Sequence, residues 1–182
     1  MKKILLLVCI IFIVINFGSC SRTKTVEPNI VSQNFLQDLY TVDEETVKDF
    51  SNMSNISNNT SADSALQTVN NLTKEIYQKF DSFITSKGYE DLMKNRIYNK
   101  YLQCAYANNC TLQCGKISLI SGETQNEYRD YNYSADINIV FNDNKNNQLE
   151  KEKGFISIVK ENGIWKINSI QVTTPSKFLE LN

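Results

Sequence analysis

The sequence contains no histidine among its 182 residues. Histidine is the commonest general base, it activates most serine and cysteine nucleophiles, and it is a frequent ligand of catalytic zinc. Its absence excludes Ser-His-Asp and Cys-His catalysis and most catalytic zinc sites. No two carboxylates stand at positions that suggest a paired acid and base either. We therefore expect a protein that is not an enzyme and that needs neither a metal ion nor another cofactor.

The sequence also has no block of positive charge. Lysine and arginine number 19 against 20 acidic residues, and loss of the first nineteen residues would remove two of the lysines. The remaining chain would carry 17 basic and 20 acidic side chains, a net charge near −3. Nucleic-acid-binding proteins usually carry a basic patch, so we do not expect nucleic acid as a partner.

The longest apolar run, Ile4–Ile15, is too short to cross a membrane. Twelve residues span about 18 Å as a helix, against a hydrocarbon core of about 30 Å. Lys2 and Lys3 precede the run, and small residues follow it just before Cys20. A charged start, a short apolar centre and small residues at the end are typical of a secretory signal peptide.

The four residues Phe17-Gly18-Ser19-Cys20 resemble the bacterial lipobox, although Phe17 replaces the usual leucine. An uncleaved anchor helix with an incidental cysteine is the alternative. The resemblance implies that residues 1–19 are a lipoprotein signal peptide and that Cys20 carries a lipid. It places the protein at the cell membrane, anchored on the extracytoplasmic face, with residues 20–29 as a polar tether. A diacylglyceryl group would supply the two chains that stable anchoring requires.

The first half of the domain shows helical spacing. Apolar residues recur every three or four positions over 30–42, and a second short helix is expected over 44–53. A polar loop should cover 51–63. The longest helix should run from Ser64 to near Phe83, with Gly88 at its end, followed by a helix over 89–101. The apolar stripe of the long helix comprises Leu66, Val69, Leu72, Ile76, Phe80 and Phe83.

After Cys110 the period changes to two, which predicts strands. The first should cover about 111–120, and the last two 155–160 and 164–172. Asn162-Gly163 between the last two predicts a type I′ hairpin turn. The second strand, over 131–141, should bury one face and expose the other. The buried set is Tyr131, Tyr133, Ala135, Ile137, Ile139 and Phe141, and the polar set is Asn132, Ser134, Asp136 and Asn138.

Helices followed by antiparallel strands predict an α+β fold, with N-terminal helices packed on one face of a curved sheet. Three stretches resemble the nuclear-transport-factor-2-like, or cystatin-like, cone domains of many Gram-positive lipoproteins. They are Asn34–Tyr40, Gly88–Leu92 with Asn95-Arg96, and Asn162–Ile167. The resemblance implies a single cone-like domain over 30–182.

Cys104, Cys110 and Cys114 are the cysteines of this domain, and outside the membrane thiols can oxidise. Cys104 could pair with either of the other two as a disulfide at the helix-to-sheet turn. A Cys110–Cys114 bridge is disfavoured within one strand, because four strand residues span about 13 Å and a bridge needs Cα atoms within roughly 7 Å. Reduced, buried thiols are the main alternative; a three-thiolate metal site or redox exchange is less favoured.

Several tyrosines cluster in sequence at the start of the sheet, among them Tyr101, Tyr131 and Tyr133. Their rings could line a pocket for a small apolar or sugar-like ligand. Alternatively, they fill the space between helices and sheet. Lys151-Glu152-Lys153 has the composition of a solvated turn or strand edge.

The sequence favours an extracytoplasmic module that binds a ligand or an envelope protein. The alternative is a structural component of an envelope secretion or conjugation machine, because cone domains also occur in such channels. A small cone-fold enzyme is the least favoured class. An open apolar cavity would indicate a binding module, and a buried acid with a perturbed pKa would indicate an enzyme. A filled cone together with an apolar patch on the outer face of the sheet would indicate assembly, and the polar set of the second strand disfavours a large interface on that face.

Overall fold

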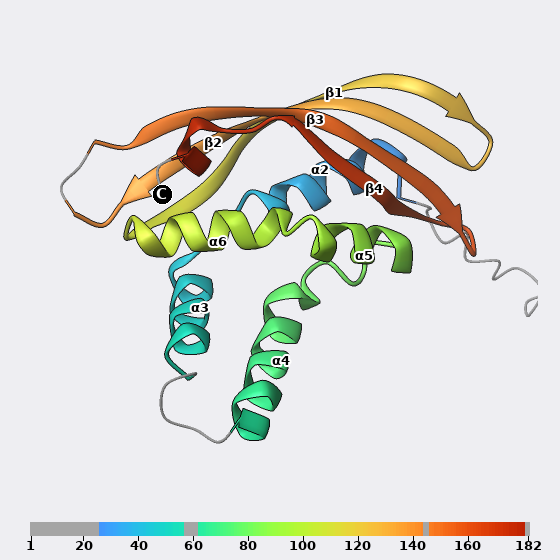
Figure 1. Ribbon diagram of the computed structural model, residues 1–182. Coiled ribbons are helices and arrows are strands. Elements are labelled where there is room, and N and C mark those ends of the chain that lie inside the picture. The colour runs from blue at the N-terminus through green and yellow to red at the C-terminus, as the bar shows by residue number, and fades with distance from the viewer. Residues whose placement is uncertain (1–25, 57–61, 144–145, 181–182) are drawn as a thin grey trace, which may run out of the picture.

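The computed structural model describes residues 26–56, 62–143 and 146–180, and it shows helices beneath one curved sheet (Figure 1). The predicted signal peptide and the predicted lipidation site, Cys20, lie outside these described residues. The helices are α2 (Pro28–Leu39), α3 (Glu44–Ile56), α4 (Ala62–Gln78), α5 (Ser86–Lys94) and α6 (Ile97–Ala107), and a 3₁₀ turn, η1, covers Lys177–Glu180. The strands are β1 (Cys110–Gln125), β2 (Tyr128–Phe141), β3 (Gln148–Glu161) and β4 (Ile164–Thr174).

The four strands form an antiparallel sheet in the order β1-β2-β3-β4. Helices α2, α5 and α6 lie against its concave face, whereas α3 and α4 point away from it (Figure 1). The α+β prediction is therefore confirmed. Within the described residues, no helix combines the length and the apolar character needed to cross a bilayer.

The period-two pattern of β2 is confirmed, because its alternate residues from Tyr131 to Ile139 are buried. The predicted hairpin turn is confirmed as well. Asn162 has a φ of 51° and Gly163 a φ of 82°, and positive φ at both central residues is what a type I′ turn requires. The first strand is longer than expected and continues to Gln125.

The predicted boundaries of the early helices need correction. Pro28 takes the first position of α2, where a missing N–H costs nothing, so this helix starts before residue 30. Residues 51–56 belong to α3 and residues 62–63 to α4, so the predicted 51–63 loop was too long at both ends. Helix α4 ends at Gln78, and turns replace the helix expected up to Phe83.

Gly88 does not end a helix, as the sequence suggested, but lies in the first turn of α5. A β-carbon at Gly88 would come within 2.6 Å of the Ile167 carbonyl oxygen, so glycine allows α5 to approach β4 closely. The single helix predicted over 89–101 is two helices. Arg96 separates them, because its left-handed backbone, with a φ of 50°, interrupts the helical path.

One buried amine links three of the helices. Lys79, directly after α4, donates hydrogen bonds to the carbonyl oxygens of Asp38 and Thr41 at 2.7 and 3.1 Å and to the Tyr98 hydroxyl at 2.7 Å. Its ammonium also lies 4.2 Å from the centroid of the Tyr98 ring. Burial lowers the pKa of Lys79 to about 8, partly offset by Asp38 and Asp43. Lys79 thus fixes the chain that runs from α4 toward the sheet.

Candidate functional site

The least expected group in the interior of the cone is the carboxyl of Glu152 on β3. This side chain is fully buried, so the prediction of a solvated turn or edge was wrong for Glu152. Its position follows from strand alternation, because Glu152 is in phase with Gly154, Ile156 and Ile158, which are also buried. Extending the apolar pattern of β3 backward by two steps would have placed Glu152 inside.

Glu152 belongs to a buried polar cluster, by which we mean Tyr40, Tyr101, Tyr133 and Glu152. The Tyr101 hydroxyl donates a short hydrogen bond to the carboxyl, and Tyr40 and Tyr133 share a hydrogen bond of 2.7 Å. The backbone N–H of Ser176 donates to the other carboxyl oxygen at 2.7 Å. The cluster therefore connects α2, α6, β2 and β3 with the residues that precede η1.

Burial sets the proton affinities in this cluster. It raises the pKa of Glu152 above the usual carboxyl range, although the hydrogen bonds from Tyr101 and Ser176 oppose that shift. Burial also raises the pKa of Tyr40, Tyr101 and Tyr133, and the nearby Glu152 carboxyl raises the pKa of each phenol further. The three phenols are therefore protonated at neutral pH, and Tyr101 is the donor to the Glu152 carboxyl.

The packing around the cluster is tight. Gly154, next to Glu152 on the same face of β3, has no room for a β-carbon, because that position is taken by the Tyr133 hydroxyl and the Gln171 carbonyl oxygen. The edge of the Tyr40 ring meets Tyr101 at a centroid distance of 5.3 Å. A buried carboxyl with a raised pKa satisfies one condition for an enzyme, but all four side chains are enclosed. The arrangement holds the C-terminal turn against the sheet.

The structure separates the three tyrosines that were predicted to line a pocket. Tyr101 and Tyr133 meet in the buried polar cluster, whereas Tyr131 lies outside it and is 8% exposed. Their burial agrees with the alternative in which these rings fill the cone. The grooves described below are lined by other residues, and the ligand-pocket role stays a prediction.

The three cysteines lie near the junction of α6 and β1. Cys104 and Cys110 are buried in the core, and Cys114 is half-buried. Burial, together with the nearby Asp136, raises the pKa of Cys114 to about 12, so this side chain is a thiol at neutral pH. Within residues 26–56, 62–143 and 146–180, no three acidic, cysteine or histidine side chains are placed to hold a metal ion. The disulfide stays a prediction.

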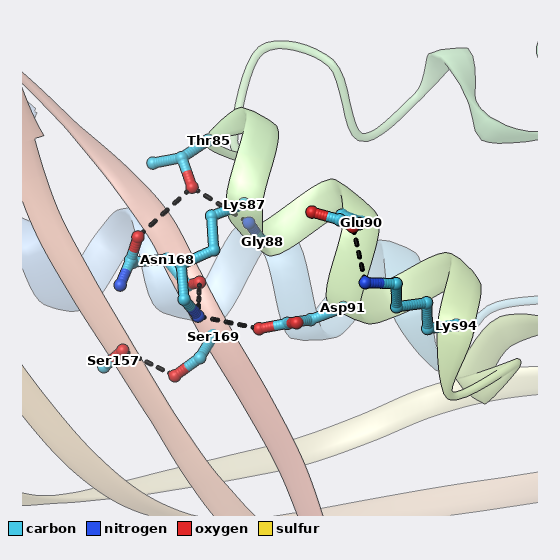
Figure 2. A network of polar contacts seen from close by, with 9 residues as sticks. All are labelled: Thr85, Lys87, Gly88, Glu90, Asp91, Lys94, Ser157, Asn168 and Ser169. Atoms are coloured by element: carbon cyan, nitrogen blue, oxygen red, sulfur yellow. Dashed lines mark hydrogen bonds and ion pairs between the residues drawn. The ribbon is translucent and has the colours of Figure 1, made fainter.

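The β4 edge of the sheet is covered by the chain that leads into α5. The N–H of Ile167 donates to Phe83 O at 2.6 Å, and the N–H of Thr85 donates to Ile167 O at 2.8 Å. Figure 2 shows the side chains that complete this contact. Thr85 caps α5 by accepting from the Gly88 N–H at 3.0 Å, and its hydroxyl donates to Asn168 at 3.3 Å.

Charged side chains lie along the same edge. Lys87 reaches the Asn168 carbonyl oxygen at 3.4 Å and pairs with Asp91 at 2.8 Å (Figure 2). Surface grooves of about 520 and 390 Å³ lie beside this contact, and each contains charged groups. The first is lined in part by Asp91 and Lys100, and the second in part by Asp81, Glu161 and Lys166.

Within residues 26–56, 62–143 and 146–180, the opposite edge, β1, is covered only near its start. Val42 exchanges backbone hydrogen bonds of 2.9 Å with Leu112, and the Gln37 amide donates to the Cys114 carbonyl oxygen at 3.1 Å. Beyond that point a groove of about 300 Å³ runs between α2 and β1. It is lined by Gln33, Asn34, Gln37, Gly115 and Ile117, none of them charged.

No family model matches this sequence, and no curated protein matches it. Among solved structures, the chain is similar to an IcmL-like type IV secretion system protein from Legionella pneumophila. The TM-score is 0.52 and the identity 12%, over 81% of this chain and 90% of that one.

Two further solved structures are similar at lower scores. One is CagV, a VirB8 homologue of the type IV secretion system of Helicobacter pylori, with a TM-score of 0.40 and 12% identity over 82% of this chain and 99% of that one. The other is a periplasmic fragment of TraM, with a TM-score of 0.41 and 9% identity over 81% and 95%. At these identities the likeness concerns the fold alone, and the first structure supports the α+β arrangement of helices on a curved antiparallel sheet.

Proposed function

We propose that this protein is an assembly component of a bacterial envelope machine of the secretion or conjugation type. The sequence favoured a binding module and treated assembly as the alternative. The likeness in fold to an IcmL-like type IV secretion protein supports the alternative better. In this proposal the domain acts through its surface and not through a ligand or substrate in its interior.

The observation that carries the proposal is the close packing of the described side chains in the interior of the cone. Tyr40, Tyr101, Tyr133 and Glu152 occupy it and hydrogen-bond to one another or to the Ser176 backbone. A ligand-binding or catalytic cone domain needs space beside its polar groups, since pockets bury most of their ligand. Here a β-carbon at Gly154 would already collide with Tyr133.

The proposal includes the lipid anchor on Cys20. A tether of about ten residues would keep the domain close to the outer surface of the cytoplasmic membrane. Cys20→Ser should abolish labelling of the protein by a radioactive or clickable fatty acid. Cys9→Ser, in the same apolar segment, is the matched control and should leave labelling unchanged. Labelling that persists in Cys20→Ser would refute the anchor.

The assembly role is tested in the bacterium that encodes the chain. Deletion of the gene should abolish transfer of DNA or protein by the envelope machine, and wild-type protein should restore it. Glu152→Gln, which preserves the size of the buried side chain, should restore transfer equally well. Normal transfer in the deletion strain would overturn the assembly role, and loss of transfer with a folded Glu152→Gln protein would favour a catalytic or ligand-binding interior.

A further inference from the structure

The uncovered part of the β1 edge is the surface with the clearest capacity for association. The hydrogen bonds that the Gln37 and Thr41 side chains and the Val42 backbone make with β1 end at Cys114. From Lys116 to Gln125, the described residues supply no backbone hydrogen bonds except those of the β1–β2 ladder. An edge strand in this state presents N–H and C=O groups that a further strand can use.

The segment Ile117–Ser121 is suited to pairing. Its five residues keep regular register with β2 between two irregularities, at Cys114/Ile117 and at Ser121/Thr124. Between those irregularities it carries no charged residue and no proline, two of the devices that protect an edge strand. Ile120 is 69% exposed and points to the face opposite the helices, so pairing would also cover an apolar side chain.

The charges at the two ends of this segment favour pairing with itself. Lys116 precedes it and Glu123 follows it. In an antiparallel pair of identical segments, the Lys116 end of one copy lies beside the Glu123 end of the other, and this holds at both ends. Neither Lys116 nor Glu123 has an ion pair within the described residues. Glu123 accepts one hydrogen bond, from the Gln125 side chain.

The groove between α2 and β1 has an uncharged lining, which suits an added strand without charged side chains. Amides of Gln33, Asn34 and Gln37 line it next to Ile117, so inward-facing side chains of an added strand would meet no charge. We infer that two copies of this protein associate through antiparallel pairing of Ile117–Ser121, which joins their sheets across a two-fold axis. This inference deepens the proposed assembly role, but self-association can be measured without any transfer activity.

Single cysteines test the inference in the full chain in its own host. Ser118→Cys, Leu119→Cys and Ile120→Cys are introduced in turn, and intact cells are treated with a thiol oxidant before non-reducing electrophoresis. A symmetric antiparallel pair places at least one of these positions beside its own copy, so one variant should give a strong band at twice the monomer mass. Wild type measures the background from Cys104, Cys110 and Cys114.

Ile164→Cys is the matched control, because Ile164 is 58% exposed but lies at the β3–β4 hairpin. It should give no more dimer than wild type. Absence of a dimer band at all three β1 positions would overturn the inference. A band at another mass would overturn it too, because it would show that a different protein occupies the edge.

A charged residue introduced into the paired segment provides a second test, in which the dissociation constant of the dimer is measured. In the detergent-solubilised full chain, Ile120→Lys should weaken dimerisation about tenfold or more, because each copy would bring a lysine into the paired segment, where the two like charges lie at or near the axis. Ile164→Lys should leave the dissociation constant within about twofold of wild type. Equal dissociation constants for wild type and Ile120→Lys, with circular dichroism showing that both fold, would contradict pairing at this edge.

Discussion

The two edge strands of this sheet are treated differently by the rest of the chain. Along β4, Phe83–Thr85 pairs with Ile167, α5 packs close through Gly88, and Lys87 reaches the Asn168 carbonyl oxygen. Along β1, comparable cover ends at Cys114 and leaves Ile117–Ser121 bounded only by irregularities in register. Among the described residues, the chain closes the β4 edge of the sheet and leaves the Ile117–Ser121 part of the β1 edge without comparable cover.

The difference shows that the described part of the chain protects the β4 edge of the sheet much more fully than the β1 edge. Free edges promote aggregation, so a protein that closes one edge with a helix, a cap and charged groups has the means to protect both. The uncharged β1 segment is therefore best explained by a partner that covers it in the assembled state. The following predictions test each side of this comparison, from the largest expected effect to the smallest.

Gly88→Ala, at the contact between α5 and β4, should lower the stability of the protein more than the other variants below. The new methyl group would lie 2.6 Å from the Ile167 carbonyl oxygen and 2.8 Å from Ile84 Cγ1, so α5 must move away from β4. We expect the free energy of unfolding to fall by about 2–3 kcal/mol in urea denaturation. Gly122→Ala on β1 is the matched control, since its nearest neighbour is Asp130 Cβ at 3.3 Å, and should cost less than about 1 kcal/mol. Equal losses would contradict the assigned role of Gly88.

Lys79 should make stability depend on pH in the alkaline range. Its pKa is lowered to about 8 in the folded protein, so between about pH 8 and the ordinary lysine pKa the unfolded chain binds more protons. Lys79 should therefore add a positive slope to the free energy of unfolding across this window, of at most about 1.4 kcal/mol per pH unit, whereas Cys114 and the buried tyrosines, whose pKa values are raised, contribute with the opposite sign. Lys79→Met should remove this slope, and Lys74→Met, at an exposed position of α4, should keep it. A slope that survives in Lys79→Met would assign it to another group.

Thr85→Ala should loosen the covered edge by a smaller amount. It removes the cap that accepts from the Gly88 N–H and the hydrogen bond to Asn168 on β4. The expected loss is about 1 kcal/mol, with faster amide exchange at Ile167. Thr85→Ser keeps the hydroxyl and should retain most of the stability. If Thr85→Ala exchanges no faster than wild type at Ile167, the cap does not secure this edge.

Ile120→Lys should have the smallest effect on the folding of the monomer. Ile120 is largely exposed, so the free energy of unfolding measured at a concentration where the chain is monomeric should change by less than about 0.5 kcal/mol. A loss of 2 kcal/mol or more would show that Ile120 contributes to the fold itself, and its use as a probe of association would fail.

Local patterns in the sequence predict the strands better than the helices. The alternation from Tyr131 to Ile139 and the Asn162-Gly163 turn depend on neighbouring residues, and the structure confirms both. The helical stripe continued through Phe80 to Phe83, but α4 ends at Gln78 because the chain must turn there to reach Ile167. Such a contact between distant segments leaves no local signal.

The interior and the edges were harder to predict for the same reason. The charged neighbours of Glu152 suggested solvent, whereas its partners Tyr101 and Ser176 lie 51 and 24 residues away along the chain. The absence of histidine carried no information about a buried carboxyl. Whether an edge is covered depends on the packing of α2 and α5, which composition does not specify.

The central claim is that this protein works through the open β1 edge and not through the filled interior. The most direct measurement compares transfer by the envelope machine in strains that carry Ile120→Lys or Glu152→Gln, with folded protein present at wild-type amounts in both. We predict that Ile120→Lys reduces transfer at least tenfold and that Glu152→Gln leaves it unchanged. Normal transfer with Ile120→Lys together with loss of transfer in Glu152→Gln would contradict the claim.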